Sequence, residues 1–234
     1  MKKKMGLAII SGVAVFATAF SMRYFINWQE PHLGGFYRQL ILELVLGIGA
    51  YSIARYLFKL PPSSLNLRIR KPIFDKYSGY SFLLGALLSS CVLTFKIPAI
   101  PILKELNVPQ FLLTMLAASI SEEILCRGLV QGIGGEGSPF FKAGRLVVSP
   151  GVASGTIVFS LIHISIYLTG GNPATCLLVM LFAFLMGIVA GKAKEKYNLG
   201  KAITTHVFFN IGGFTAGILI NIGSMILTGH LISH

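Results

Sequence analysis

Long runs of uncharged apolar residues dominate the chain, and short polar segments separate them. The runs cover residues 5–22, 78–95, 106–121, 146–191 and 202–229, and a further apolar stretch at 38–58 carries Glu43. A helix that crosses a bilayer needs about 20 such residues. The run 146–191 is long enough for two crossings, and 202–229 is either one helix or two short ones broken at Gly212 and Gly213. The pattern predicts an all-α polytopic membrane protein, a bundle of about eight transmembrane helices.

The composition agrees with this prediction. Of the 234 residues, 54% are apolar and only 12% are charged, and the mean hydropathy is +0.74. These values exclude an ordinary water-soluble globular domain. No low-complexity tract, flexible linker or internal repeat marks a boundary, so we expect residues 1–234 to form a single transmembrane domain. Two polar connectors, at 59–80 and 134–145, are expected to lie on the cytoplasmic side.

The formal net charge of +12 comes from an uneven distribution of Lys and Arg. If the N-terminus is inside, the alternation of spans places all but four of the 20 Lys and Arg residues on the inner side. The four exceptions are Arg23, Arg38, Lys96 and Lys104. Inner loops of membrane proteins are enriched in Lys and Arg. We therefore interpret the positive charge as a consequence of membrane topology and not as a nucleic-acid binding surface. We predict a cytoplasmic N-terminus in a prokaryotic cell membrane.

The first apolar run also resembles a signal peptide, with a basic start and small residues at Ala17 and Ala19. Since the run continues to Met22 and the rest of the chain is polytopic, an uncleaved first helix is favoured. The cysteines have no paired spacing and lie in predicted spans, so they are expected to be buried apolar residues: Cys91, Cys126 and Cys176.

Several glycines recur at four-residue spacing, which lets helix backbones approach closely in lipid. These pairs are Gly151 with Gly155, Gly187 with Gly191, and Gly213 with Gly217. We expect the later helices to form a compact bundle.

Ionisable side chains inside the spans are the candidates for function, because an unpaired charge at the bilayer centre costs at least ~2.5 kcal/mol. Besides Glu43, they lie in "SEEILCR", "FSLIH" and "HVFFN". Glu123 and Arg127 are four residues apart on one helix face, so we expect an ion pair between them. Glu122 points about 100° away from that face. For Glu43 we expect a buried Lys or a backbone group as partner.

The polar groups of these three segments are expected at similar depths. Glu122, His163 and His206 lie roughly 15, 20 and 10 Å from the cytoplasmic helix ends at 1.5 Å per residue. A carboxylate shielded from bulk water is an effective proton acceptor near neutral pH, so Glu122, helped by His163, could activate a water. His206 and Asn210 carry N–H donors of the kind that stabilise a tetrahedral oxyanion. A proton acceptor together with two oxyanion donors is suited to hydrolysing an amide bond.

At these residues the chain resembles a known family. "EEILCR" matches the EExxxR motif, "FSLIH" the FxxxH motif and "HVFFN" the HxxxN motif of the CAAX protease and bacteriocin-processing family, also called the CPBP or Abi family of intramembrane proteases. The three motifs occur in the family's order, and the resemblance covers about residues 105–215.

The resemblance implies an intramembrane endopeptidase of the type II CAAX prenyl kind. By this analogy Glu122 and His163 activate water, and His206 and Asn210 stabilise the oxyanion. We interpret Glu123 and Arg127 as a structural ion pair. Phe159, four residues before His163, is expected to pack beside it and fix its rotamer.

The implied partners are a peptide or protein substrate, including lipidated or prenylated C-terminal peptides and precursors of signalling peptides, together with membrane lipids. No nucleic acid and no cofactor are expected. We expect the site to open toward the cytoplasm or laterally to lipid.

Three alternatives stay open. Glu122, His163 and His206 are residue types that bind zinc, which would make the protease zinc-dependent, although the HExxH signature is absent. A transporter also uses buried carboxylates and histidines, but transporters often repeat their broken helices in both halves, whereas here the motifs fall in the second half alone. A membrane protein that binds peptides without turnover, such as an immunity protein, has no need of acid, base and oxyanion groups.

Overall fold

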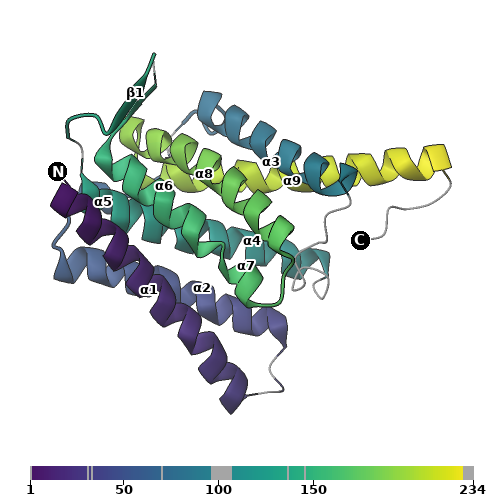
Figure 1. Ribbon diagram of the computed structural model, residues 1–234, viewed down its shortest axis with the longest axis horizontal. Coiled ribbons are helices and arrows are strands. Elements are labelled where there is room, and N and C mark those ends of the chain that lie inside the picture. Colours follow the sequence, from purple (N-terminus) through teal and green to yellow (C-terminus); the bar gives the residue numbers. More distant parts are fainter. Residues whose placement is uncertain are drawn as a thin grey trace.

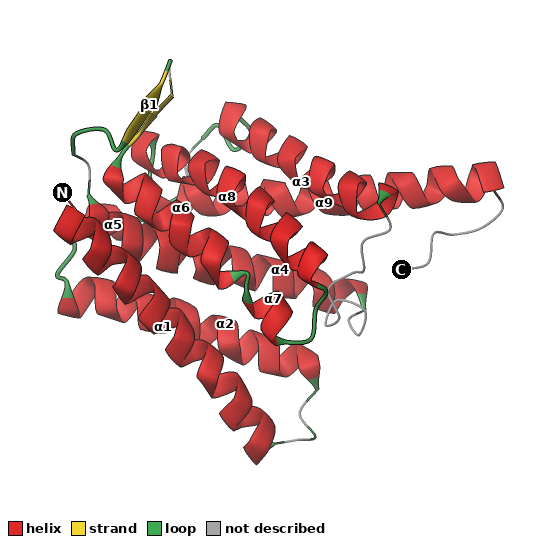
Figure 2. Ribbon diagram, in the orientation of Figure 1, coloured by secondary structure: helices red, strands yellow, loops and turns green. Residues whose placement is uncertain are grey.

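A computed structural model describes residues 2–30, 32, 34–69, 71–95, 107–135, 137–144 and 146–228, with the side chain of residue 27 left out. The protein is all-α apart from one small hairpin (Figures 1 and 2). Its elements are α1 (Lys2–Gln29), α2 (Gly35–Ser52), η1 (Ile53–Leu57), η2 (Pro62–Leu65), α3 (Lys76–Thr94), α4 (Val108–Glu123), η4 (Ile124–Val130), α5 (Gln131–Gly134), β1 (Phe141–Ala143), β2 (Leu146–Val148), α6 (Pro150–Ile162), α7 (Ser165–Leu168), α8 (Pro173–Lys196) and α9 (Leu199–Thr228).

Within the described residues, seven helices are long and apolar enough to cross a membrane, so the chain is a multi-pass membrane protein. The bundle therefore has seven such helices rather than about eight among these residues. The difference lies in the last apolar run, which is a single continuous helix, α9. Gly212 and Gly213 do not break it.

The glycines of α9 serve packing instead. A Cβ on Gly212 would lie 2.0 Å from the carbonyl oxygen of Phe82 in α3. A Cβ on Gly85 of α3 would lie 1.9 Å from the carbonyl oxygen of Phe209 in α9. Only glycine at both positions lets the two backbones come this close, which is how small residues bring helices together in lipid. In Figure 1, α3 and α9 run side by side along the upper edge of the bundle.

Glycine also sets the contact between α6 and its neighbours. A Cβ on Gly155 would lie 2.6 Å from the carbonyl oxygen of Cys126, and one on Gly187 of α8 would lie 3.0 Å from the side chain of Thr156. Gly191 faces Val152 in the same way, at 2.9 Å. The close approach that four-residue spacing predicted for these pairs is therefore present.

The π-helical segment η4 lies at the centre of the bundle. It continues α4, and α1, α2, α6 and α9 all contact it. All seven of its residues are buried, including Arg127. π-Helical turns within α-helices are uncommon and are frequent at functional sites.

Capping residues define where α4 and α6 begin, and therefore the depth in the bundle at which their motif side chains lie. Asn107 accepts a hydrogen bond from the backbone N–H of Gln110 in a capping box before α4. Ser149 accepts from the N–H of Val152 before α6, where Pro150 occupies the first turn. Each cap satisfies an N–H group that the helix leaves unpaired.

The two polar connectors are folded against the bundle rather than loose. In the first, η2 buries Leu65 against the core, and Asn198 donates to the carbonyl oxygen of Arg68. The fully buried Lys201 at the start of α9 pairs with Asp75 at 3.0 Å. The second connector, for which no fold was predicted, contains the hairpin β1–β2, with Phe141 paired to Val148.

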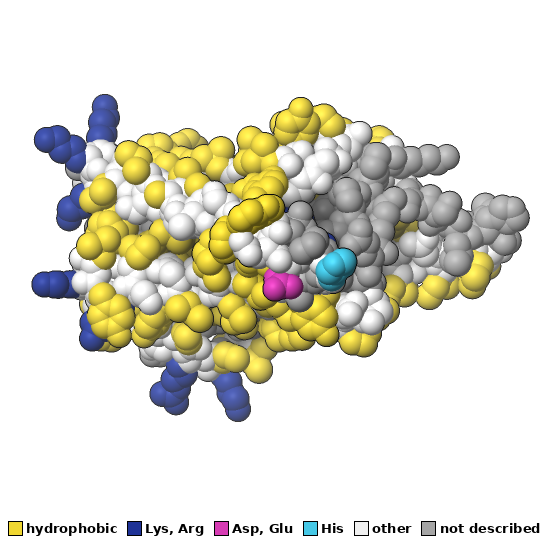
Figure 3. All heavy atoms as spheres, turned by 90° about the horizontal axis from the view of Figure 1, so that it is seen from below, with side chains coloured by type: hydrophobic (Ala, Val, Ile, Leu, Met, Phe, Trp, Pro, Cys, Tyr) yellow, Lys and Arg dark blue, Asp and Glu magenta, His cyan; other side chains and the backbone are white. Residues whose placement is uncertain are grey.

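Lys and Arg residues gather at the end of the bundle that carries the N-terminus (Figure 3). We call it the basic end; among the described residues it holds Lys2, Lys3, Lys4, Arg55, Lys59, Arg68, Lys71, Lys76, Lys142, Lys192, Lys194, Lys196 and Lys201. Arg23 and Arg38 lie toward the opposite end, as expected. Arg127, assigned to the inner side from its charge, is instead fully buried inside the protein. Lys96 and Lys104 lie outside the described residues.

Candidate active site

The glutamates of the first motif end α4, and they have different surroundings. Glu123 is fully buried, and its Oε2 lies 3.2 Å from Nε of Arg127, which is also fully buried. The ion pair predicted from four-residue spacing is therefore present. The side chain of Glu122 keeps 17% of its surface exposed and faces a cavity.

Arg127 ties three helices together. Its Nη1 and Nη2 donate to the carbonyl oxygens of Gly155 in α6 and Gly187 in α8, each at 3.2 Å. Its guanidinium carbon lies 4.7 Å from the ring centre of Phe159. The guanidinium thus donates to carbonyl oxygens at two helix crossings and forms an ion pair with one carboxylate, and a buried charge is tolerated only with such partners.

Glu123 also contacts the third motif, which the sequence did not predict. Its Oε1 lies 3.2 Å from Nδ1 of His206. The two residues are 83 positions apart, so no local spacing could have indicated the contact. Glu123 therefore links Arg127 on its own segment to His206 on α9.

This contact constrains the tautomer of His206. A carboxylate paired with Arg127 can only accept, so Nδ1 of His206 is the donor in its bond to Glu123. Nε2 is then directed toward Glu122, whose Oε2 lies 3.9 Å away. That separation is too long for a direct hydrogen bond and leaves room for an oxygen atom that contacts both groups.

His163 is oriented by a hydrogen bond within its own helix. It ends α6, and its Nδ1 lies 2.7 Å from the carbonyl oxygen of Phe159. A carbonyl only accepts, so Nδ1 carries the proton and Nε2 of the neutral ring keeps a free lone pair. This tautomer suits a proton acceptor.

Phe159 packs against both histidines. Its ring centre lies 5.1 Å from that of His163 and 5.3 Å from that of His206, both in edge-to-face geometry. The side chain is 2% exposed. The contact with His163 was expected from the sequence, whereas the contacts with His206 and Arg127 come from the tertiary structure.

Asn210 lies one helical turn beyond His206 on α9 and bonds to α4. Its Nδ2 donates to Oγ of Ser119 at 2.9 Å and to the carbonyl oxygen of Met115 at 3.4 Å. Both hydrogens of the amide are therefore engaged, the second in a long and weak bond. Ser119 was not predicted as a partner of Asn210.

One cavity of about 250 Å³ collects these residues. Its walls include Glu122 from α4, Phe159 and His163 from the end of α6, and His206 and Asn210 from α9. Glu123 and Arg127 lie behind this wall. The structure thus brings all four residues predicted to take part in catalysis to one space between three helices.

Residues 104–212 match the profile of a protein family described as Rce1-like, "Type II CAAX prenyl endopeptidase Rce1-like". Residues 104–212 therefore form a domain of the Rce1-like family. The matched range contains all three motifs and ends two residues after Asn210. The family is one of CAAX-type intramembrane proteases, which act on protein substrates. No curated protein and no solved structure matched the chain.

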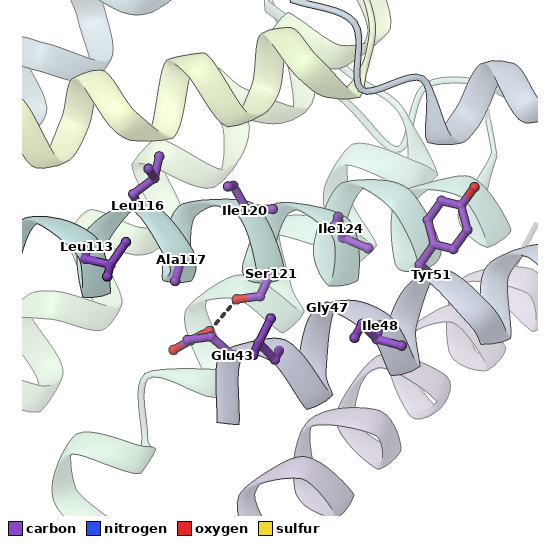
Figure 4. Close-up of a pocket in the computed structure, with 11 residues that line it drawn as sticks. Glu43, Gly47, Ile48, Tyr51, Leu113, Leu116, Ala117, Ile120, Ser121 and Ile124 are labelled. Carbon is purple, nitrogen blue, oxygen red and sulfur yellow. Dashed lines mark hydrogen bonds between the residues drawn. The ribbon is translucent and has the colours of Figure 1, made fainter. Parts of the chain in front are cut away.

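A carboxylate from outside the Rce1-like domain also lines the cavity. Glu43 of α2 is 5% exposed and accepts a hydrogen bond from Oγ of Ser121 (Figure 4). It accepts another from Nε2 of Gln39. The prediction that Glu43 pairs with a buried Lys or a backbone group was wrong. The actual partner, Ser121, directly precedes Glu122, so Glu43 ties α2 to α4 beside the motif.

Glu43 also lines an apolar groove of about 390 Å³ between α2 and α4. The groove is lined mainly by Leu, Ile and Ala side chains of the two helices, with Tyr51 near one end (Figure 4). Glu43 lies where the groove and the cavity of the Rce1-like domain meet, because it lines both.

The zinc alternative needs Glu122, His163 and His206 to converge on one point. In the part of the chain that the structure describes, no three His, Cys, Asp or Glu side chains are close enough together to hold a metal ion. Nδ1 of each histidine faces a protein oxygen instead. Cys91, Cys126 and Cys176 are free thiols, of which the last two are buried.

Proposed function

We propose that the protein is an intramembrane endopeptidase that hydrolyses a peptide bond of a membrane-associated or lipidated peptide. The observation that carries this proposal is the convergence of Glu122, His163, His206 and Asn210 on one cavity. Membership of a family of CAAX-type proteases supports the same activity.

In the proposed step, a water lies between Glu122 and His163 and attacks the carbonyl carbon of the substrate. The carboxylate of Glu122, assisted by the free Nε2 of His163, accepts the proton of the water. The proton then passes to the amide nitrogen as the C–N bond breaks, which releases an amine and a carboxylate.

His206 and Asn210 stabilise the oxyanion that forms on the carbonyl oxygen. Because Nδ1 of His206 donates to Glu123, Nε2 is a donor only in the imidazolium form. Glu123 orients the ring for this role through its 3.2 Å contact with Nδ1. Asn210 donates by giving up its 3.4 Å contact with Met115 while the bond to Ser119 holds the amide in place.

A comparison of peptides in membranes tests this proposal. Membranes that contain the wild-type protein are compared with membranes that contain Glu122→Gln, which keeps the shape of the side chain and removes the base. The matched control is Glu195→Gln, a carboxylate in a surface pair with Lys192 at the basic end.

Cleavage products that appear with wild type and Glu195→Gln, and that are missing with Glu122→Gln, support proteolysis and identify the substrate. Identical peptide profiles from all three folded proteins would contradict the proposal. A peptide-binding or transport role would then fit better.

A further inference from the structure

We propose that Glu43 is a positioning residue for the active site and that it carries a proton at neutral pH. Glu43 lies on α2, outside the Rce1-like domain of residues 104–212. As a neutral carboxylic acid bonded to Ser121, it orients the end of α4 so that Glu122 faces the cavity. This inference rests on the proposed function and adds to the site a residue that none of the three motifs contains.

Glu43 is deeply buried and has no counter-charge. The residue is 5% exposed. Among the residues that the structure describes, no Lys, Arg or His nitrogen lies within 4.0 Å of its carboxyl oxygens, and this includes Arg23, which lines the same cavity. An ionised carboxylate here would be an unpaired charge within a membrane span, which is strongly unfavourable. A bound proton removes that charge.

The titratable groups around Glu43 do not support it as an anion. Glu122 from α4, His163 from α6 and His206 from α9 line the same cavity of about 250 Å³. Glu122 is the proposed base and is ionised in that role, so a second ionised carboxyl group in this cavity would repel it. Nδ1 of each histidine faces another oxygen, not Glu43. A neutral Glu43 therefore leaves the negative charge of the cavity on Glu122.

The hydrogen bonds of Glu43 fit a carboxylic acid. Oε1 accepts from Nε2 of Gln39, as the carbonyl oxygen of an acid does. Oε2 contacts Oγ of Ser121, and the same Oγ lies 3.2 Å from the carbonyl oxygen of Ala118. A hydroxyl has one hydrogen and a carbonyl has none, so both contacts of Oγ are hydrogen bonds only when Oε2 supplies a hydrogen. An ionised Glu43 accepts from Ser121, whereas the neutral acid donates to Ser121 and Ser121 then donates to Ala118.

This chain of hydrogen bonds fixes the helical turn that precedes Glu122. Ser121 is 3% exposed and directly precedes Glu122 in α4. Gly47, one turn after Glu43 on α2, packs against the same residue, because a Cβ on Gly47 would lie 3.4 Å from Cα of Ser121. Neighbours on a helix point about 100° apart, so the rotation that holds Ser121 against α2 also sets the direction of Glu122. Loss of the bond should therefore misplace the proposed base.

Infrared spectroscopy of the purified protein tests whether Glu43 carries a proton. The carbonyl stretch of a carboxylic acid is separate from the bands of an ionised carboxylate. The difference spectrum between wild type and Glu43→Gln at neutral pH should contain the acid band. The control, Glu195→Gln, removes a carboxylate that pairs with Lys192 and should remove ionised bands alone. Loss of ionised bands alone in Glu43→Gln would overturn the inference.

Cleavage kinetics test the positioning role. Glu43→Gln, the conservative variant, is uncharged and can still donate to Ser121, so its kcat should stay within about threefold of wild type. Glu43→Leu removes the hydrogen bonds and should lower kcat by about 10–10²-fold with little change in KM, as expected for a misplaced catalytic group.

Ser121→Ala breaks the same link from the other side and should lower kcat by a similar factor. The double variant Glu43→Leu/Ser121→Ala should lose no more activity than either single variant, because both changes remove one interaction. Ser121→Ala alone provides the comparison with Glu43→Gln if Glu43→Leu does not fold.

Three kinetic outcomes would overturn the inference. Equal losses in Glu43→Gln and Glu43→Leu would show that the charge of Glu43 is required. Full kcat in a folded Glu43→Leu or Ser121→Ala protein would show that the link does not position the base. Additive losses in the double variant would show that Glu43 does not act through Ser121.

The two proposals fail in different ways. The acid band of Glu43 without any cleavage by the wild-type protein would contradict the protease proposal and leave the protonated Glu43 intact. Cleavage that depends on Glu122, together with an ionised Glu43 or with full kcat in Ser121→Ala, would contradict the role of Glu43 alone.

Discussion

Oε1 of Glu123 lies 3.2 Å from Nδ1 of His206, which joins the second glutamate of the EExxxR motif to the histidine of the HxxxN motif. The other carboxylate oxygen of Glu123 lies 3.2 Å from Arg127. The neighbouring Glu122 faces the cavity instead. Two adjacent carboxylates thus have separate tasks, one in holding the site and one in the proposed chemistry.

Glu123→Gln should destabilise the fold. The change leaves the guanidinium of Arg127 buried without its counter-charge, which costs about 3–5 kcal/mol for a broken buried pair. Thermal unfolding of the purified protein in detergent measures the effect. The control, Glu195→Gln, breaks a partly exposed pair with Lys192 and should cost no more than about 1 kcal/mol. Equal midpoints for the two variants would contradict a structural role for Glu123.

Glu122→Gln should lower activity without lowering the stability of the fold. Its side chain is partly exposed and its ion-pair partner, Nε2 of His206, lies 3.9 Å away, so the thermal midpoint should stay near that of wild type. Turnover should fall at least about 10²-fold, because the proposed base is removed. Peptide binding, measured separately, should persist. Loss of binding in parallel with turnover would contradict the role of a base.

Asn210→Ala should lower kcat by about 10²–10³-fold with a small effect on KM, as expected when one oxyanion donor is removed. The control is Ser119→Ala, which removes the hydroxyl that Asn210 contacts and leaves the amide in place. Its effect on kcat should be much smaller. If both variants lose the same activity, Asn210 acts by holding α9 against α4 rather than on the oxyanion.

Asp75 should make stability depend on pH in the acid range. Burial raises the pKa of Asp75, but hydrogen bonds from the N–H of Ser78 and from Lys201 outweigh it and hold the pKa below its ordinary value. A carboxyl group with a lowered pKa stabilises the fold above the pKa of the unfolded chain, about 4, and loses that contribution as the pH falls through its folded value.

Asp75→Asn keeps a capping side chain but removes the charge beside the buried Lys201, so it should lower stability at neutral pH by about 1–3 kcal/mol. Unfolding midpoints of both proteins across pH 3–7 measure this, with the gap narrowing below about pH 4. A gap that stays constant across the range would show that the charge of Asp75 contributes nothing.

Gly85→Ala should separate α3 from α9. The added Cβ would lie 1.9 Å from the carbonyl oxygen of Phe209, so the helices must move apart at a cost of about 1–3 kcal/mol or more. Activity should fall too, because α9 carries His206 and Asn210. Gly223→Ala is the control, since nothing lies within 4 Å of its Cβ, and it should keep stability and activity. Similar results for the two variants would show that the close approach is not required.

The sequence by itself determined what lies within one helix. Apolar runs indicated the spans, and four-residue spacing predicted the pairs Glu123 with Arg127 and Phe159 with His163, because helical periodicity fixes neighbours on one face. The motifs marked Glu122, His163, His206 and Asn210, which the structure brings to one cavity.

Only the tertiary structure decided the contacts between helices. Three hydrogen bonds depend on how each helix is rotated and how close its neighbour comes: His206 to Glu123, Ser121 to Glu43, and Asn210 to Ser119. The single span of α9 depends on the same packing. The sequence left open whether residues 202–229 form one helix or two, and in the structure Gly212 is a packing contact with α3 within one continuous helix. Periodicity specifies the faces of a helix, but which faces meet depends on the packing of the whole bundle.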